Sequence, residues 1–135
     1  MQNKSDAAET PWPVELVVSA ARDVLTVRYE GGRSHVLPAE LMRVLTPSAE
    51  RTGHGARSVI GGKRRVTIQS VSPVGRYAVR IGFSDGHNTG LYTLDALYEM
   101  GARQEMLWAE YLAELDATGL SRDKAGMAPA PVLKG

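Results

Sequence analysis

The sequence predicts a small α+β fold, in which hairpins form a small antiparallel sheet, short helices follow the hairpins and an amphipathic helix lies near the C-terminus. The predicted strands are short runs of Val, Ile, Leu and aromatic residues, separated by glycine turns instead of long helices. Strands grouped in this way favour an antiparallel arrangement over a doubly wound one. A pattern of strand, turn, strand and helix also occurs twice, at residues 27–42 and 82–99. Its aligned positions are Tyr29 with Phe83, Gly32 with Gly86, and Leu37 with Leu91.

The length and composition fit one globular domain. The chain has 135 residues, of which 43% are hydrophobic, enough to bury a single core. It contains no cysteine, which excludes disulfides, thiolate metal sites and cysteine nucleophiles. The first residues lack the pattern of a secretion signal, and no run approaches the roughly 20 apolar residues of a membrane span. We therefore expect a cytoplasmic protein without a membrane partner.

The first part of the chain predicts a leader and then a domain. Residues 1–12 are expected to form a flexible leader, which ends at Pro11-Trp12-Pro13, because two prolines disfavour regular structure. The domain itself is expected to span residues 13–101. Its first three strands are predicted at residues 14–20, 24–29 and 34–37.

Two helices and a loop are predicted between the repeated patterns. Pro38 and Glu40 favour the first turn of a helix that reaches Leu45. Thr46-Pro47 repeats this start signal, so a second, short helix is expected there. Four glycines then predict a loop over residues 53–63.

The second half of the domain repeats the strand pattern. Strands are predicted at residues 66–74, 77–83 and 89–92, with Asp85-Gly86 in the last turn. Thr93 is a candidate N-cap for a helix through Met100, which Gly101 is expected to end.

A longer helix is predicted over residues 102–119. Its apolar stripe is formed by Leu107, Trp108, Tyr111, Leu112 and Leu115, and Gly119 ends it. We interpret the stripe as core packing, with partner binding as the alternative if the stripe is exposed. The remaining residues, 120–135, are expected to form a flexible tail.

Charges are unevenly distributed along the chain. Residues 51–84 contain seven Arg or Lys and no acid, whereas residues 85–123 contain eight acids and two arginines. The basic segment supplies candidate anion-binding side chains beside Gly61-Gly62, namely Arg57, Lys63, Arg64 and Arg65. The segment lacks a phosphate-loop motif and interleaved aromatic residues, which argues against nucleic-acid binding.

Three histidines are weak candidates for metal or ligand binding. His87 follows Asp85 in a predicted turn and is the best placed of them for ligand binding, although a hydrogen bond across the hairpin is the simpler interpretation. His54 lies between two glycines and is interpreted as a loop residue, and His35 as a surface residue of a strand. Motifs of serine hydrolases and zinc proteases are absent from the sequence, so we do not expect an enzyme.

Four blocks of the sequence resemble the N-terminal domain of gamma-butyrobetaine hydroxylase-like proteins. The resemblance covers about residues 13–101, and the blocks occur in the same order as in the family. They comprise residues 37–43, residues 48–50 with 53–55, residues 73–80 and residues 83–92.

The resemblance implies a small α+β domain that is found in several contexts. Family members precede the catalytic domain of 2-oxoglutarate-dependent dioxygenases, are fused to P-loop carriers of iron-sulfur clusters, or occur alone in bacteria without an assigned function. The catalytic domain and its iron ligands have no counterpart in this chain, so the resemblance does not imply dioxygenase activity.

The resemblance also bears on metal binding. In the dioxygenases, three cysteines and one histidine of this domain hold a zinc ion, and His87 aligns with that histidine. The cysteine cluster falls near residues 45–51, where this chain has no cysteine. We therefore expect no structural zinc and no other cofactor, and His87 is the one metal contact that the resemblance leaves open.

Three functions remain as hypotheses. The first is a non-catalytic accessory or protein-interaction domain that serves an iron-sulfur or oxidoreductase partner. The alternatives are a metal- or small-ligand-binding module centred on His87, with Asp85 or His54, and nucleic-acid binding through residues 57–65. The sequence leaves the oligomeric state open, as well as whether the last helix packs on its own domain.

Overall fold

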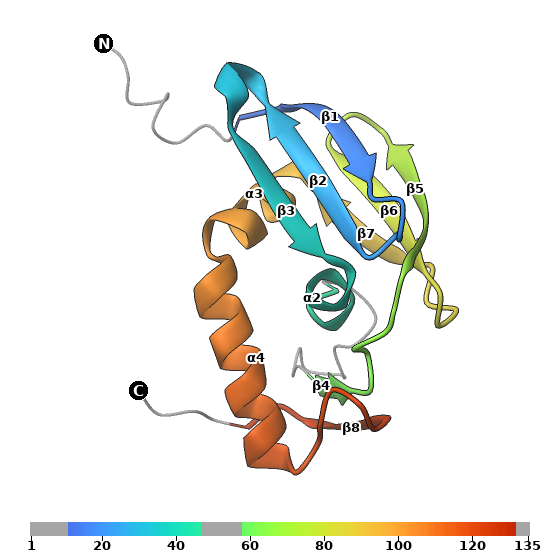
Figure 1. Cartoon of the computed structure of the whole chain (residues 1–135), viewed down its shortest axis with the longest axis vertical. Coiled ribbons are helices and arrows are strands. Elements are labelled where there is room, and N and C mark those ends of the chain that lie inside the picture. The colour runs from blue at the N-terminus through green and yellow to red at the C-terminus, as the bar shows by residue number, and fades with distance from the viewer. Residues whose placement is uncertain (1–10, 47–57, 132–135) are drawn as a thin grey trace.

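The computed structural model describes residues 11–46 and 58–131, and it confirms the predicted α+β class (Figure 1). Within these residues the chain forms two three-stranded antiparallel sheets and one two-stranded sheet. The first sheet contains β1 (Pro13–Val18), β2 (Val24–Tyr29) and β3 (Ser34–Pro38), and a short 3-10 turn (Glu30–Gly32) joins its last two strands. The second sheet contains β5 (Ile68–Val74), β6 (Ala78–Phe83) and β7 (Gly90–Thr93).

Each three-stranded sheet is followed directly by a helix, so the predicted repetition is real. Helix α2 (Ala39–Val44) follows β3, and helix α3 (Leu94–Ala102) follows β7. Thr93 caps α3 as predicted, because its hydroxyl accepts a hydrogen bond from the Ala96 N–H. No helix in the described part of the chain is both long enough and apolar enough to cross a bilayer.

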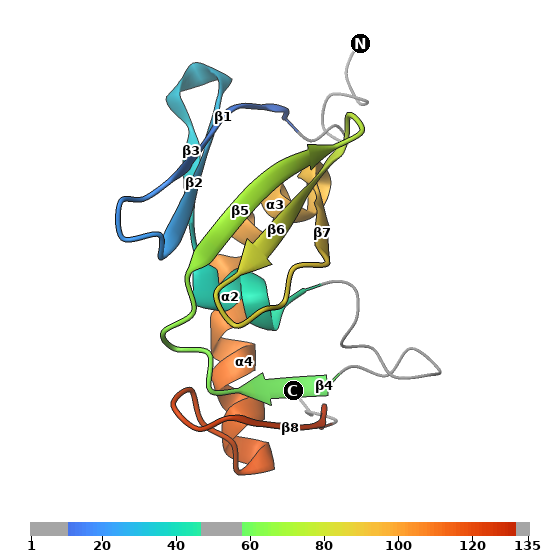
Figure 2. The same ribbon diagram turned by 90° about the vertical axis from the view of Figure 1, so that its right-hand side faces the viewer.

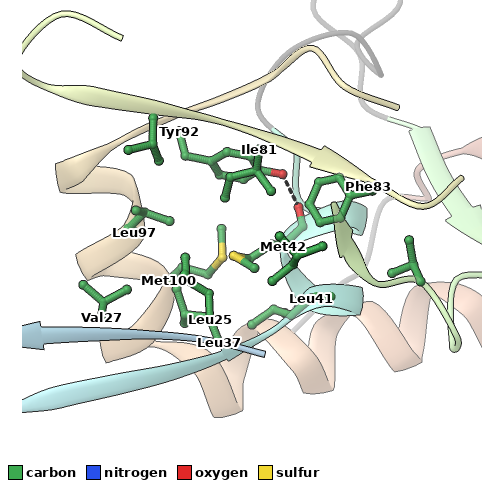
Figure 3. Close-up of a cluster of buried hydrophobic side chains, with 14 of the residues drawn as sticks. Leu25, Val27, Leu37, Leu41, Met42, Ile81, Phe83, Tyr92, Leu97 and Met100 are labelled. Atoms are coloured by element: carbon green, nitrogen blue, oxygen red, sulfur yellow. Dashed lines mark hydrogen bonds between the residues drawn. The ribbon is translucent and has the colours of Figure 1, made fainter. Parts of the chain in front are cut away.

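The core lies between the two three-stranded sheets, which face each other (Figures 1 and 2). Apolar side chains from the strands meet there with side chains from α2 and α3 (Figure 3). The strands contribute Leu25, Val27, Leu37, Ile81, Phe83 and Tyr92, and the helices contribute Leu41, Met42, Leu97 and Met100. Because side chains alternate between the two faces of a strand, these residues point inward from both three-stranded sheets. Both sheets and both helices are therefore needed to close one core.

The alignment of the two repeats is wrong by one residue at their last strands. In the first sheet, Leu37 pairs with Leu25. The position in the second sheet that corresponds to Leu25 is Val79, and its partner is Tyr92 instead of Leu91. Tyr92 is fully buried, whereas Leu91 is 37% exposed. The paired positions are 12 residues apart in the first repeat (25 and 37) and 13 apart in the second (79 and 92), and a one-residue shift turns each side chain to the other face.

Strands β4 (Ser58–Gly61) and β8 (Gly126–Pro129) differ from the prediction. They pair antiparallel within segments for which the sequence predicts a loop and a flexible tail. Gly61 is needed because a Cβ atom there would lie 2.4 Å from the Ser121 carbonyl oxygen. Gly62 has a φ of 77°, which also favours glycine. These glycines therefore allow the close approach of the C-terminal segment, and their interpretation as loop signals is wrong for residues 58–61.

Helix α4 (Gln104–Thr118) forms where the sequence predicts the long helix, and it packs on its own domain. Tyr111 and Leu115 on its inner face pack with Val44 and Val59. Gly119 ends the helix in the left-handed conformation, with a φ of 74°. In both views, β4 and β8 lie beside the C-terminal part of this helix (Figures 1 and 2).

Gly101 does not end α3 as predicted. It lies inside the helix, where a Cβ atom would come within 2.2 Å of the His35 ring. His35 is half-buried there and packs edge-on against Tyr29 and Tyr98, so it is not the simple surface residue that the sequence suggests. The second short helix expected at Thr46-Pro47 falls mostly outside the described residues.

Candidate functional site

The turn between β6 and β7 holds the two best candidates, Asp85 and His87. The Phe83 N–H donates to the His87 carbonyl oxygen (2.8 Å), and the Gly86 N–H donates to the Phe83 carbonyl oxygen (3.0 Å). Gly86 has a φ of 91°, a conformation in which glycine is favoured. The Asp85 side chain closes the turn by accepting from the His87 N–H at 3.1 Å.

Asp85 also joins three separate parts of the chain. Its Oδ2 accepts from the Arg43 Nε of α2 (2.8 Å) and from the Lys63 Nζ (2.5 Å) in the segment that precedes β5. The Arg43 side chain is 7% exposed and that of Asp85 20% exposed. Partial burial opposes ionisation of Asp85, but hydrogen bonds from Lys63, the His87 backbone and Arg43 outweigh it and lower the pKa to about 2.

This arrangement does not fit a metal site. Two cations occupy one oxygen of Asp85, and they would repel a third. The described residues contain no group of three or more His, Cys, Asp or Glu placed to hold a metal ion. His87 is half-buried in the turn, and the positions of the family's cysteines begin with Leu45, which packs against the core, and Thr46. The described residues therefore do not fit the zinc ion that the resemblance raises.

Thr46 belongs to a buried hydrogen-bond network instead. Its hydroxyl donates to the Arg43 carbonyl oxygen at 2.9 Å and lies 2.8 Å from the Tyr92 hydroxyl. The Tyr92 hydroxyl in turn donates to the Met42 carbonyl oxygen at 2.6 Å, as the dashed line in Figure 3 shows. These bonds satisfy the last carbonyl groups of α2 and tie the helix to β7.

Two cations of the basic segment are paired with acids of the same chain. Lys63 contacts Asp85, and Arg64 forms a two-point contact with Asp123 at 2.5 and 2.9 Å. Arg65 is exposed, whereas Arg57 and His54 lie outside the described residues. Ion pairing within the chain therefore engages Lys63 and Arg64, two of the four candidate anion-binding side chains.

A second polar cluster fixes the C-terminal segment to α2. The Arg122 guanidinium donates to both carboxylate oxygens of Glu40, at 2.9 and 2.7 Å, and its carbon lies 5.0 Å from the centre of the Trp108 ring. Glu40 is buried, and the contact with Arg122 supplies the countercharge that burial requires. Beside this cluster is a cavity of about 350 Å³, lined also by Pro38, Leu41, Gln104 and Glu105.

Two large aromatic side chains remain exposed at another place. Trp12 is 56% exposed and Tyr77 is 65% exposed, and their ring centres are 5.6 Å apart in an edge-to-face arrangement. A small cavity of about 220 Å³ beside them is also lined by Pro11, Thr93, Leu94 and Asp95. We call these six residues the aromatic site. Exposed aromatic residues that meet at a cavity are typical of binding surfaces.

Sequence reasoning missed Arg43, Arg122, Glu40 and the aromatic site as functional or structural centres. The contact between Glu40 and Arg122 joins residues 82 positions apart, so no local pattern reveals it. Trp12 could have indicated the aromatic site, because a tryptophan between two prolines is unusual in a solvated leader. The two prolines, however, led to the prediction of a flexible leader.

Solved structures resemble this chain over most of its length. Two proteins with NMR solution structures share 45% and 40% sequence identity with it, with TM-scores of 0.75 and 0.74. The first match covers 85% of this chain and 92% of the other, and the second covers 90% of both. A protein of unknown function from Acidithiobacillus ferrooxidans, of the DUF971 family, is 34% identical, with a TM-score of 0.55 over 70% of this chain and 99% of its own.

No curated protein matches the chain. The family described as gamma-butyrobetaine hydroxylase-like, N-terminal, matches residues 16–98, which is more than half of the sequence. This match contains the second three-stranded sheet, all of the first except the first three residues of β1, the Asp85 turn and Tyr77. The chain therefore belongs to the gamma-butyrobetaine hydroxylase-like N-terminal domain family.

Proposed function

We propose that this chain is a non-catalytic, cytoplasmic protein-interaction domain, which binds another protein through the aromatic site. The observation that carries the proposal is the exposure of Trp12 and Tyr77, which pack against each other but leave more than half of each side chain in water. Aromatic side chains of this kind dominate the energy of many protein interfaces. The contexts of the family, given above, suggest an iron-sulfur or oxidoreductase protein as the partner.

The charged groups support the same proposal because they already have partners within the domain. Asp85 is held by Arg43 and Lys63, and Glu40 by Arg122. A catalytic acid or base needs access to a substrate and a pKa near the working pH, whereas the pKa of Asp85 is about 2. These groups stabilise the scaffold and leave the aromatic site as the stronger binding surface.

The two other hypotheses have less support. In a metal- or ligand-binding module centred on His87, Asp85 could take part only by leaving its two cations, and His54, the other candidate, lies outside the described residues. Nucleic-acid binding through residues 57–65 would draw on Lys63 and Arg64, which contact Asp85 and Asp123. No observation supports either hypothesis as strongly as the exposed aromatic pair supports protein binding.

Affinity capture from the native cell tests the proposal when three baits are compared. The baits are the wild-type chain, a Trp12→Ala/Tyr77→Ala double variant and a Leu112→Ala control, since Leu112 is also exposed but lies on α4. We expect a partner that the wild type and the control capture equally and that the double variant captures at least about tenfold less. A partner retained by the double variant, or no partner for the wild type, would contradict the proposal.

A further inference from the structure

The aromatic site is built by three segments that a firm scaffold holds together. Trp12 precedes β1, Tyr77 ends the turn between β5 and β6, and Asp95 lies in the first turn of α3. The Leu94 N–H donates to the Tyr77 carbonyl oxygen at 2.8 Å, which fixes the backbone of the exposed tyrosine to the start of the helix. Figure 2 shows this turn beside α3, at the end of the molecule opposite β4 and β8. The backbone that carries Tyr77 and Leu94 is therefore preorganised, which lowers the entropic cost of binding.

The shape of the site suits a flat, rigid apolar group. The two rings meet edge to face at an interplanar angle of 68°, and both line the cavity. A cavity of about 220 Å³ is too small for a folded element, but it accepts one or two compact side chains. The proline ring has this form, and an extended proline-containing segment loses little entropy on binding because its backbone is already restricted.

Addition of a strand to a sheet edge is a less suitable way of binding. The strands β1 and β5 lie at sheet edges, and each contains a proline, Pro13 or Pro73. Each also has a register irregularity against its neighbour. Proline and bulges are devices that prevent pairing at an edge. A segment that binds this domain therefore gains more from the aromatic side chains than from backbone hydrogen bonds at these edges.

The negative charge of Asp95 favours a particular residue next to the proline in the bound segment. Asp95 is exposed at the rim of the cavity and forms no ion pair with another described residue. A carboxylate beside an aromatic groove favours a Lys or Arg in the bound segment and disfavours an acidic one. An exposed pair of this kind contributes little affinity, but it sets the orientation and the choice of ligand.

We propose that the aromatic site binds an extended segment of the partner protein in which a proline is followed or preceded by a Lys or Arg. This inference rests on the proposed function, because it specifies how the interaction domain recognises its partner. The proline packs in the cavity against the rings of Trp12 and Tyr77, and the basic residue faces Asp95.

The two tryptophans of the chain provide a direct test, because each gives one indole N–H signal in a proton-nitrogen NMR spectrum. Trp12 reports on the aromatic site, and Trp108, which packs under Arg122, is an internal control. A Trp12→Phe variant assigns the two signals. The probe is a synthetic peptide of consecutive prolines with a lysine at each end. Two matched peptides carry glutamate in place of lysine, or alanine in place of proline.

We expect the lysine-proline peptide to shift the Trp12 signal in a saturable way and to leave the Trp108 signal in place. The alanine peptide should cause no shift, and the glutamate peptide should bind about two- to fivefold more weakly. Tyr77→Ala should reduce the affinity at least about tenfold, and Asp95→Asn should abolish the preference for lysine over glutamate. Leu112→Ala should bind as the wild type does.

Three results would overturn the inference. The first is no shift of Trp12 with the lysine-proline peptide, and the second is a shift of Trp108 instead. The third is a Trp12 signal that moves when the protein alone is diluted, because a second copy of the chain would then occupy the site. If the peptide fails to bind while the Trp12→Ala/Tyr77→Ala variant still loses its partner in affinity capture, the proposed function stands and only the proline recognition is wrong.

Discussion

The two ends of strand β6 carry opposite kinds of chemistry. Tyr77 precedes the strand and exposes an aromatic ring beside Trp12, whereas Asp85 follows it and holds a carboxylate between Arg43 and Lys63. The charged end is partly buried and connected to the rest of the fold by side chains, while at the aromatic end the Leu94 N–H donates to the Tyr77 carbonyl oxygen. The charged cluster at Asp85 thus joins distant parts of the fold, whereas the exposed aromatic pair is the binding surface that we propose. Changes at the charged end should therefore alter stability, and changes at the aromatic end should alter binding.

The largest effect is expected from Asp85→Ala. We expect the free energy of unfolding to fall by about 3 kcal/mol, because Arg43 and Lys63 would both lose the carboxylate that they contact in partly buried positions. Urea unfolding followed by circular dichroism measures this loss. Asp95→Ala is the matched control and should cost about 0.5 kcal/mol, because Asp95 is exposed. Equal losses in the two variants would remove the distinction between the two ends of β6.

Protonation of Asp85 should also lower the stability of the domain in acid. The pKa of Asp85 is lowered from 3.8 to about 2, because hydrogen bonds from Lys63, the His87 backbone and Arg43 outweigh the effect of burial. The folded chain thus binds the proton more weakly than the unfolded chain. The contribution is complete above the unfolded pKa and is lost as the pH falls from 3.8 to about 2.

We expect this contribution to be about 2 kcal/mol, from roughly 1.4 kcal/mol for each unit of the shift. Unfolding curves of the wild type and of Asp85→Asn, recorded at about pH 5 and about pH 2, measure it. The wild type should lose more stability between these two conditions than the variant. Parallel losses would show that other carboxylates control the acid sensitivity.

A smaller effect is expected where Arg122 joins the C-terminal segment to α2. Arg122→Ala should lower the free energy of unfolding by about 1.5 kcal/mol, since the buried Glu40 would lose both of its charged hydrogen bonds. The variant should also increase hydrogen exchange of backbone amides in β8 more than in β6. Arg103→Ala is the control, because Arg103 is exposed and does not contact Glu40. Unchanged exchange in β8 would mean that strand pairing alone holds the segment.

Local patterns predicted most of the fold but not the contacts that join its ends. Strands were predicted at residues 24–29 and 77–83 from their apolar residues, and the structure has them at 24–29 and 78–83, facing a single core. Strands β4 and β8 were missed because glycine indicates a loop in a local pattern, whereas Gly61 here permits a close approach of distant backbone. The turn at Asp85 was predicted from Asp-Gly, but its two cations come from distant segments that only the tertiary structure brings together.

The smallest effect on stability is expected from the Trp12→Ala/Tyr77→Ala double variant, although its effect on binding should be the largest. An exposed aromatic pair contributes about 1 kcal/mol or less to folding, because most of its surface remains in water. The urea midpoint should therefore stay close to that of the wild type, while the affinity for the lysine-proline peptide falls at least about tenfold. Urea unfolding and NMR titration of the same samples give the two values. A stability loss as large as that of Asp85→Ala would show that the aromatic residues hold the leader to the fold, and their exposure would then be no argument for a partner.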